Sequence, residues 1–395
     1  MAAIVSSAER AYWEQGVVRP KWKQAWIRRL TGALTLGVFL FQQVAPSIAG
    51  SIEVDGNPSS TSSATLTIAP NNVPVVNIAR PDASGLSHNK FRDFNVDGRG
   101  VVLNNKSKDA QSKLAGLIAG NPKLQGRSAS TILGEVTGAN RSVLEGYTEV
   151  HGAAANWILA NPNGITCNGC GFINIPRATL STGRPGVTSQ GLESLSVEGG
   201  TVVIGPGGLD ATETSAIDII ARAAEINGAI QGGDQTELRI IAGRNNVDYN
   251  SLQASALSDA GGKPAFGIDS SALGGMYAGR ITLVGTEGGV GVRLPDNVQA
   301  TTGALSLTAD GRIIVNNTQS VGNTTITSTH GDVDFFGGTR PQGELSISAA
   351  GTTTVKSGAV VGAPDSVRIN TGTLAVEAGT LAAGLEAGGG LSQGR

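Results

Sequence analysis

The stretch ALSLTADGRIIVNNTQSVGN, residues 304–323, decides the fold. It opens with an alternating strand in which Leu305 and Leu307 are separated by a polar residue; Gly, Asn or Asp then turns the chain, and a second short apolar run follows. Similar blocks of 19 to 21 residues occur from about residue 194 onward, and SLSVEGGTVVIGPGGLDATET (194–214) and SAIDIIARAAEINGAIQGGDQ (215–235) are the first two. A unit of this length cannot bury its own apolar face, so the blocks must stack.

Two or three short strands with sharp corners per block predict an all-β fold, a right-handed parallel β-helix with coils spaced ~4.8 Å apart. Inward Val, Ile, Leu and Ala fill a narrow core, which suits an aromatic content of only 4%. An antiparallel sandwich would show strands every 8–12 residues without the longer repeat. Residues 50–150 are less repetitive, and we expect them to form an amino-terminal β cap over the open end.

Composition limits the possible partners. Charged residues make up 15% of the chain, the formal net charge is −2 and no basic block occurs, which argues against nucleic acid. GPGG (205–208) lacks a following Lys-Ser/Thr, and GTEGGVGVR (285–293) has no opening helix, so neither predicts a phosphate or dinucleotide site. We expect no cofactor and no catalytic residues.

The first 49 residues predict a long signal peptide. Basic residues in RPKWKQAWIRRL precede an apolar run, 33–41, that is too short to span a bilayer comfortably. Small residues then suit cleavage between Ala49 and Gly50. A twin-arginine signal and a buried amino-terminal helix are the alternatives.

The stretch NWILANPNGITCNGCGF, residues 156–172, predicts a corner between two strands. Asn161, Pro162, Asn163 and Gly164 match the preferences of a type I β-turn, and apolar runs lie on both sides. Cys167 and Cys170 are spaced for a small local disulfide in a secreted chain. A redox motif, a zinc site and free thiols remain alternatives.

Four stretches together resemble the secretion domain of two-partner secretion exoproteins, the filamentous haemagglutinin and contact-dependent growth-inhibition family. They are HNKFRDFNVDGRGVVLNN (88–105), GNPKLQGRSASTILGEVTG (120–138), NWILANPNGITCNGCGFINIPRATLSTG (156–183) and SALGGMYAGRITLVGTEGGVGVR (271–293). The resemblance implies export as an unfolded chain to the cell surface or extracellular space. The implied partner is a TpsB-type outer-membrane β-barrel transporter with periplasmic POTRA domains.

The resemblance also implies residues that the transporter recognises. The family motif Asn-Pro-Asn-Gly-Ile stands unchanged and ends at Ile165, whereas Asn-Pro-Asn-Leu appears as Asn121, Pro122, Lys123 and Leu124. Lys123 puts any side-chain role of the third position in doubt. The β-turn could also serve only to shape the β-helix.

These features predict four segments: a signal peptide (1–49), a secretion domain (50–300), haemagglutinin-type repeats (301–384) and a Gly-rich tail (385–395). The leading hypothesis is a non-catalytic exoprotein that acts in adhesion through a host or bacterial surface receptor or glycan. The alternatives are the truncated stalk of a growth-inhibition toxin and a β-helix enzyme acting on polysaccharides. An enzyme would need clustered carboxylates, whereas Asp210, Asp218, Glu225, Asp310 and Asp332 fall at different phases of the repeat.

Overall fold

The computed structural model describes residues 51–56, 60, 62–258, 261–271 and 273–384. The predicted signal peptide, its cleavage site at Ala49 and Gly50, and the predicted tail 385–395 lie outside the described residues. Among the described residues, the model contains no helix of the length and apolar character needed to cross a membrane.

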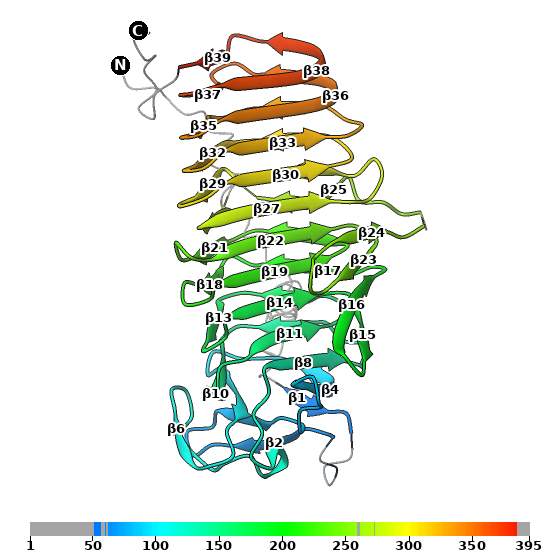
Figure 1. Cartoon of the computed structure of the whole chain (residues 1–395), viewed down its shortest axis with the longest axis vertical. Coiled ribbons are helices and arrows are strands. Elements are labelled where there is room, and N and C mark those ends of the chain that lie inside the picture. The colour runs from blue at the N-terminus through cyan, green and yellow to red at the C-terminus, as the bar shows by residue number, and fades with distance from the viewer. Residues whose placement is uncertain (1–50, 57–59, 61, 259–260, 272, 385–395) are drawn as a thin grey trace, which may run out of the picture. The chain divides into compact units, whose positions relative to one another are not determined.

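Three stacks of parallel strands wind around one core, so the predicted parallel β-helix is confirmed. In Figure 1 the coils lie one above another, from β4 and β8 near the amino-terminal end to β38 and β39 at the other. Each complete coil supplies one strand to each stack, as β30, β31 and β32 do for the stretch at residues 304–323. Ile281 of the preceding coil lies opposite Leu305, and Thr324 of the next coil lies opposite it on the other side.

The first stack contains β4 (Leu86–Phe94), β8 (Thr131–Val136), β11 (Asn156–Ala160), β14 (Arg177–Ser181), β19 (Ala216–Ala221), β22 (Glu237–Ala242), β27 (Arg280–Gly285), β30 (Leu305–Ala309), β33 (Thr324–Ser328), β36 (Leu345–Val355) and β38 (Val367–Val376). The second contains β9 (Ser142–Leu144), β12 (Ile165–Cys167), β17 (Thr201–Ile204), β20 (Ala223–Ile226), β25 (Phe266–Ser270), β28 (Gly291–Arg293), β31 (Ile313–Val315) and β34 (Val333–Phe335), and continues into the second halves of β36 and β38. The third contains β3 (Pro74–Asn77), β5 (Val101–Asn105), β10 (Tyr147–Gly152), β13 (Cys170–Ile173), β18 (Leu209–Ala211), β21 (Ala229–Gly232), β26 (Gly275–Ala278), β29 (Asn297–Ala300), β32 (Asn317–Ser320), β35 (Thr339–Pro341), β37 (Val360–Ala363) and β39 (Thr380–Ala383).

The core follows from the alternation in sequence. In β30 the buried residues are Leu305, Leu307 and Ala309, and the polar residues between them are half-buried. Because successive side chains of a strand point to opposite faces, every second residue enters the narrow interior. Large aromatic side chains gather near the amino-terminal end, where Phe91, Phe94 and Trp157 pack with ring centroids 5.0 and 5.4 Å apart.

The cap is smaller than the sequence indicates, because parallel stacking already includes β3, β4 and β5. β1 (Ile52–Val54) and β2 (Thr65–Ile68) close the two sheets by pairing antiparallel with β4 and β3. A hairpin of β6 (Ala110–Ser112) and β7 (Gly116–Ile118) covers the outer face of this end, and η1 (Pro122–Leu124) is a single 3-10 turn.

An antiparallel sheet of β15 (Arg184–Thr188), β16 (Gly191–Val197), β23 (Asn245–Asp248) and β24 (Ala254–Ala256) flanks the β-helix on the right of Figure 1. The strand expected to open the first repeat block, from residue 194, belongs to this sheet and not to a coil. That expectation was wrong because Leu195 and Val247 pack against apolar residues that face outward from the coils, such as Ile158 and Ile220.

Candidate functional site: the asparagine corners and the amino-terminal cap

The second asparagine motif forms the corner between β11 and β12. The carbonyl of Asn161 accepts the Gly164 N–H at 3.0 Å, which closes a β-turn, and Gly164 has a φ of +109°. Asn161 is fully buried, and its Oδ1 accepts the Asn163 N–H at 2.9 Å. Its Nδ2 donates to Asn140 O and Ser142 Oγ, both at 3.0 Å. The side chain therefore holds its own turn and ties that turn to the preceding coil.

The first motif repeats this arrangement in a 3-10 turn. Asn121 is fully buried and caps η1, because its Oδ1 accepts the Lys123 N–H at 3.0 Å. Its Nδ2 donates to Ile78 O at 2.9 Å and to Asn104 O at 3.0 Å. Both asparagines thus use an amide oxygen for the turn and an amide nitrogen for earlier strands or loops.

The third position of each motif also reaches backward. Asn163 Nδ2 donates to Gly138 O at 2.8 Å. Lys123 is 9% exposed and donates from Nζ to Ser60 O at 2.7 Å. Like Asn163, Lys123 donates a side-chain hydrogen bond to an earlier backbone carbonyl, although that carbonyl is farther away in sequence. The side chain at the third position therefore has a structural role in both motifs.

Little of either motif reaches solvent. Asn161, Gly164, Ile165, Asn121 and Leu124 are buried. Pro122 and Asn163 are exposed and Pro162 is half-buried. A partner that meets the folded domain can therefore contact these three residues but not the two leading asparagines.

Cys167 and Cys170 form a disulfide between the end of β12 and the start of β13, with Cα atoms 5.3 Å apart. Both side chains are buried in the β-helix core. The disulfide closes the corner that follows the Asn161 turn. The described residues contain no group of three or more His, Cys, Asp or Glu placed to hold a metal.

A buried carboxylate fastens the β6–β7 hairpin to the cap. Glu149 accepts Ser112 Oγ at 2.7 Å, Lys113 N at 2.9 Å and Leu114 N at 2.8 Å. His151 lies beside it with Nδ1 3.9 Å from a Glu149 oxygen. Burial lowers the pKa of His151, and Glu149 opposes this shift. The hairpin is therefore held by a polar contact that the sequence motifs did not reveal.

Two of the carboxylates considered for an enzyme make structural contacts. Asp218 is fully buried between Arg177 and Arg239, at 2.5 and 2.7 Å. Burial alone would raise the pKa of Asp210, but the hydrogen bonds that it accepts from the Tyr147 hydroxyl, at 2.6 Å, and from Thr212 together lower that pKa.

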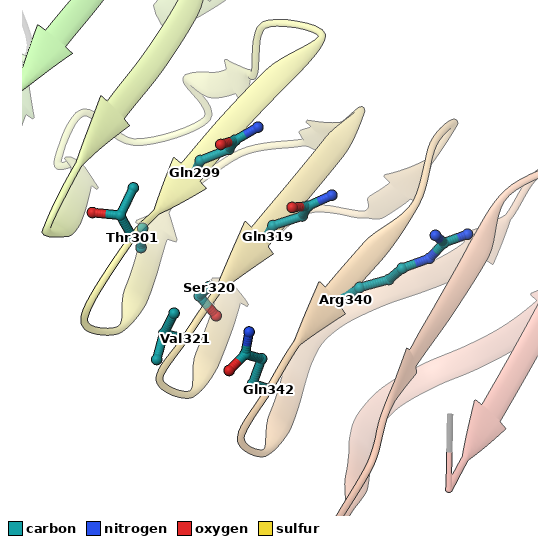
Figure 2. Close-up of a pocket in the computed structure, with 8 residues that line it drawn as sticks. Gln299, Thr301, Gln319, Ser320, Val321, Arg340 and Gln342 are labelled. Carbon is teal, nitrogen blue, oxygen red and sulfur yellow. The ribbon is translucent and has the colours of Figure 1, made fainter. Parts of the chain in front are cut away.

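A shallow cavity of about 140 Å³ lies on the third stack. Figure 2 shows Gln299, Gln319 and Arg340 extending in parallel from neighbouring coils beside it. The residues that line this cavity carry amide, hydroxyl and guanidinium groups but no carboxylate. The cavity therefore offers hydrogen-bond donors without the acid pair that glycoside hydrolysis uses.

Comparison with known proteins gives the family. The TPS secretion domain model matches residues 50–315. The chain belongs to the TPS secretion domain family. A crystal structure of the filamentous hemagglutinin secretion domain is similar to this TPS domain with a TM-score of 0.60 and 34% identity, covering 85% of this chain and 100% of that one. The resemblance drawn from the sequence is thereby confirmed.

Two curated relatives of the TPS domain chain are much longer proteins. A 16S rRNA endonuclease CdiA of Enterobacter cloacae is 43% identical over 364 residues, which is 91% of this chain and 10% of the relative. A tRNA nuclease CdiA of Escherichia coli is 49% identical over 272 residues, which is 68% of this chain and 8% of the relative. The chain thus spans about a tenth of the length of the curated relatives that it matches.

Sequence reasoning missed two buried asparagines of the TPS domain that act like the motif residues. Asn89 accepts the Ala79 N–H and donates to Leu133 O. Asn105 accepts the Ala129 N–H and donates to Ala153 O. Both stand in HNKFRDFNVDGRGVVLNN, Asn89 inside β4 and Asn105 at the end of β5, where no proline marks a turn.

Proposed function

We propose that this chain is the secretion-directing part of an exoprotein that crosses the outer membrane through a dedicated β-barrel transporter with periplasmic POTRA domains. The exoprotein then acts at the cell surface or in the extracellular space. The observation that carries this proposal is the TPS secretion domain match over residues 50–315. Its support from the fold is a capped parallel β-helix that resembles the filamentous hemagglutinin secretion domain.

Asn161 and Asn121 take part in this function mainly through folding. Each side chain is fully buried and bonded within the domain. Contact between their amides and the transporter therefore has to occur before the domain folds, and the same residues then complete the corners when the chain reaches the far side. Of the predicted recognition residues, Pro122, Pro162 and Asn163 remain accessible afterward.

The test compares secretion with refolding. The full chain is expressed in a Gram-negative host with and without a TpsB-type outer-membrane transporter, and the amount of chain in the medium is measured. We expect release only with the transporter. Release of the chain at the same level without the transporter would refute the proposal. Asn161→Ala and Asn163→Ala are then compared for secretion and for refolding in vitro. We expect Asn161→Ala to impair both secretion and refolding, and Asn163→Ala to refold almost normally.

Two roles are proposed for the exoprotein as a whole. Adhesion through a surface receptor or glycan was the leading hypothesis from the sequence and stays a prediction. The names of the relatives support the alternative, the stalk of a contact-dependent growth-inhibition toxin, about equally. A competition assay distinguishes them, because growth inhibition lowers the recovery of susceptible neighbours and adhesion alone leaves that recovery unchanged.

A further inference from the structure

Side chains from consecutive coils line up on the outer face of the third stack. β29, β32 and β35 pair in parallel, so Gln299 lies opposite Gln319, and Gln319 lies opposite Arg340 (Figure 2). Tyr277 of β26 lies opposite Gln299 and extends the line by one coil. Because neighbouring strands lie about 4.8 Å apart, these residues, here called the third-stack row, span roughly 14 Å along the axis of the β-helix.

Arg340 has no carboxylate partner among the described residues, unlike the arginines of nearby coils. Arg280, Arg293 and Arg312 each bond to a carboxylate, at 3.3, 2.6 and 2.5 Å. Arg340 is half-buried, and its Nε is shielded from solvent without a hydrogen bond. Since a partly desolvated guanidinium group without an acceptor is unfavourable, a ligand carboxylate would supply what this site lacks, and it matches the planar fork of arginine.

The glutamines of the row offer a second kind of contact. The side-chain amides of Gln299 and Gln319 extend beside the cavity of about 140 Å³ and bond to no other group of the described chain. An amide both donates and accepts hydrogen bonds, which is also what a hydroxyl group does. A string of phosphates would instead need several cations. The row therefore suits a ligand that is rich in hydroxyl groups and carries a single charge near Arg340.

Neighbouring residues widen this surface and give it apolar contacts. Thr301, Val321 and Gln342 follow the row residues by two positions, and alternate residues of a strand share one face. Val321 is 43% exposed, and Tyr277 is half-buried. Thr301 donates to Asp234 Oδ1 at 2.8 Å, so an acid already occupies that end. The charge of an anionic ligand is therefore favoured at the opposite end, beside Arg340.

These groups match the chemistry of a linear acidic sugar chain. A pyranose residue of an extended glycan advances by about the spacing of a coil, so successive sugars can meet successive side chains. We infer that the third-stack row binds a uronate-containing glycan. A sugar carboxylate bonds to Arg340, hydroxyl groups bond to the two glutamines, and the apolar face of a sugar ring packs on Tyr277. The residues that line the cavity include no carboxylate to cleave the glycan.

Secretion does not account for this surface. Gln319 and Arg340 lie after residue 315, where the match to the secretion domain ends. An acidic peptide is a poorer match, because β32 is paired with β29 and β35 on its two sides and cannot accept a further strand. The use of the row at the cell surface rests on the proposed function, and it gives the proposed adhesive role a class of ligand.

The test measures binding by calorimetry with the full chain refolded in vitro. The probes are oligomers of galacturonate, alginate and hyaluronan. Methyl-esterified galacturonan presents the same sugar backbone without its charge, and poly-glutamate presents carboxylates without sugars. We expect at least one uronate oligomer to bind, esterification to weaken binding by about tenfold, and poly-glutamate to bind no better than the esterified glycan.

Two variants place the ligand on the row. Arg340→Gln should weaken binding by about tenfold through loss of the charged donor, and Gln319→Glu should do the same through repulsion of the sugar carboxylate. Gln319 is exposed, so the second variant leaves the core unchanged. Arg368→Gln is the matched control, because Arg368 is exposed on β38 in the first stack. Tryptophan fluorescence in urea checks that all variants keep the fold.

The possible results separate this inference from the proposed function. Absence of binding to all three uronate oligomers would overturn the inference, as would equal losses in Arg368→Gln and Arg340→Gln or equally tight binding of poly-glutamate. Secretion that needs the transporter would still support the proposed function in each of these cases. Conversely, release without the transporter would refute the proposed function and leave binding by the refolded chain intact.

Discussion

Replacing Asn161 by alanine should destabilise the folded domain without changing its surface. Asn161 is fully buried, and its side chain bonds the Asn163 N–H, Asn140 O and Ser142 Oγ. Alanine removes these bonds and leaves their partners without a donor or acceptor. At about 1 kcal/mol for each bond, the expected loss is roughly 3 kcal/mol of the free energy of unfolding.

Trp157 provides the assay. It is the only tryptophan after residue 49, and it is fully buried in the aromatic cluster of β11. Urea unfolding of a chain that begins at residue 51, followed by tryptophan fluorescence, therefore reports on the coil that contains the corner. Because stacked coils can unfold in parts, a second probe such as circular dichroism is needed to check that the transition is shared.

Asn163→Ala is the matched control. Asn163 is exposed, and its amide donates to Gly138 O at 2.8 Å and more weakly to Asn161 Oδ1 at 3.2 Å. Its loss should cost less than about 1 kcal/mol. A loss below 1 kcal/mol for Asn161→Ala, or an equal loss in the two variants, would refute the assignment of Asn161 as the residue that holds the corner.

Gly134→Ala should lower the urea midpoint at a cost of about 1–3 kcal/mol, because the added Cβ would lie 2.5 Å from the Trp157 ring; an unchanged midpoint contradicts the close packing. Lowering the pH below about 6.5 should destabilise the fold through His151, because the unfolded state binds a proton that the buried ring resists. His151→Gln should therefore reduce the fall in midpoint between pH 7.5 and 5.5, and parallel pH profiles would count against this. Asp218→Ala should cost about 2–3 kcal/mol, because Arg177 loses its buried carboxylate and Arg239 keeps only Glu237; the cost is less than for a fully buried pair because both guanidinium groups are partly hydrated. A neutral effect in urea would show that hydration replaces the ion pairs.

The repeating fold was predictable from sequence because one physical requirement recurs in each coil. Leu305 and Leu307 must enter a narrow core, and a block of about 20 residues has no other surface on which to bury them. The corner at Asn161 was predictable for a similar local reason: the preferences of Pro162 and Gly164 for particular backbone angles act within the turn itself.

The flanking sheet could not be predicted in the same way. The strand that contains Leu195 alternates like a coil strand, and only its partners distinguish the two. Those partners are outward-facing residues such as Ile220, which belongs to a different coil. The burial of Asn161 and the clasp around Glu149 also depend on groups distant in sequence, so no local pattern could reveal them.

The side chains of the asparagine motifs bond to residues that come earlier in the chain, and this favours assembly of the β-helix from its amino-terminal end. Asn161 and Asn163 find their carbonyl partners at Asn140 and Gly138, and Asn121 finds one at Ile78. A chain that emerges amino end first therefore presents each acceptor before the donor that needs it. At these two motif corners the new coil therefore gains bonds to chain that is already in place, and those bonds oppose its return while the next segment is still arriving.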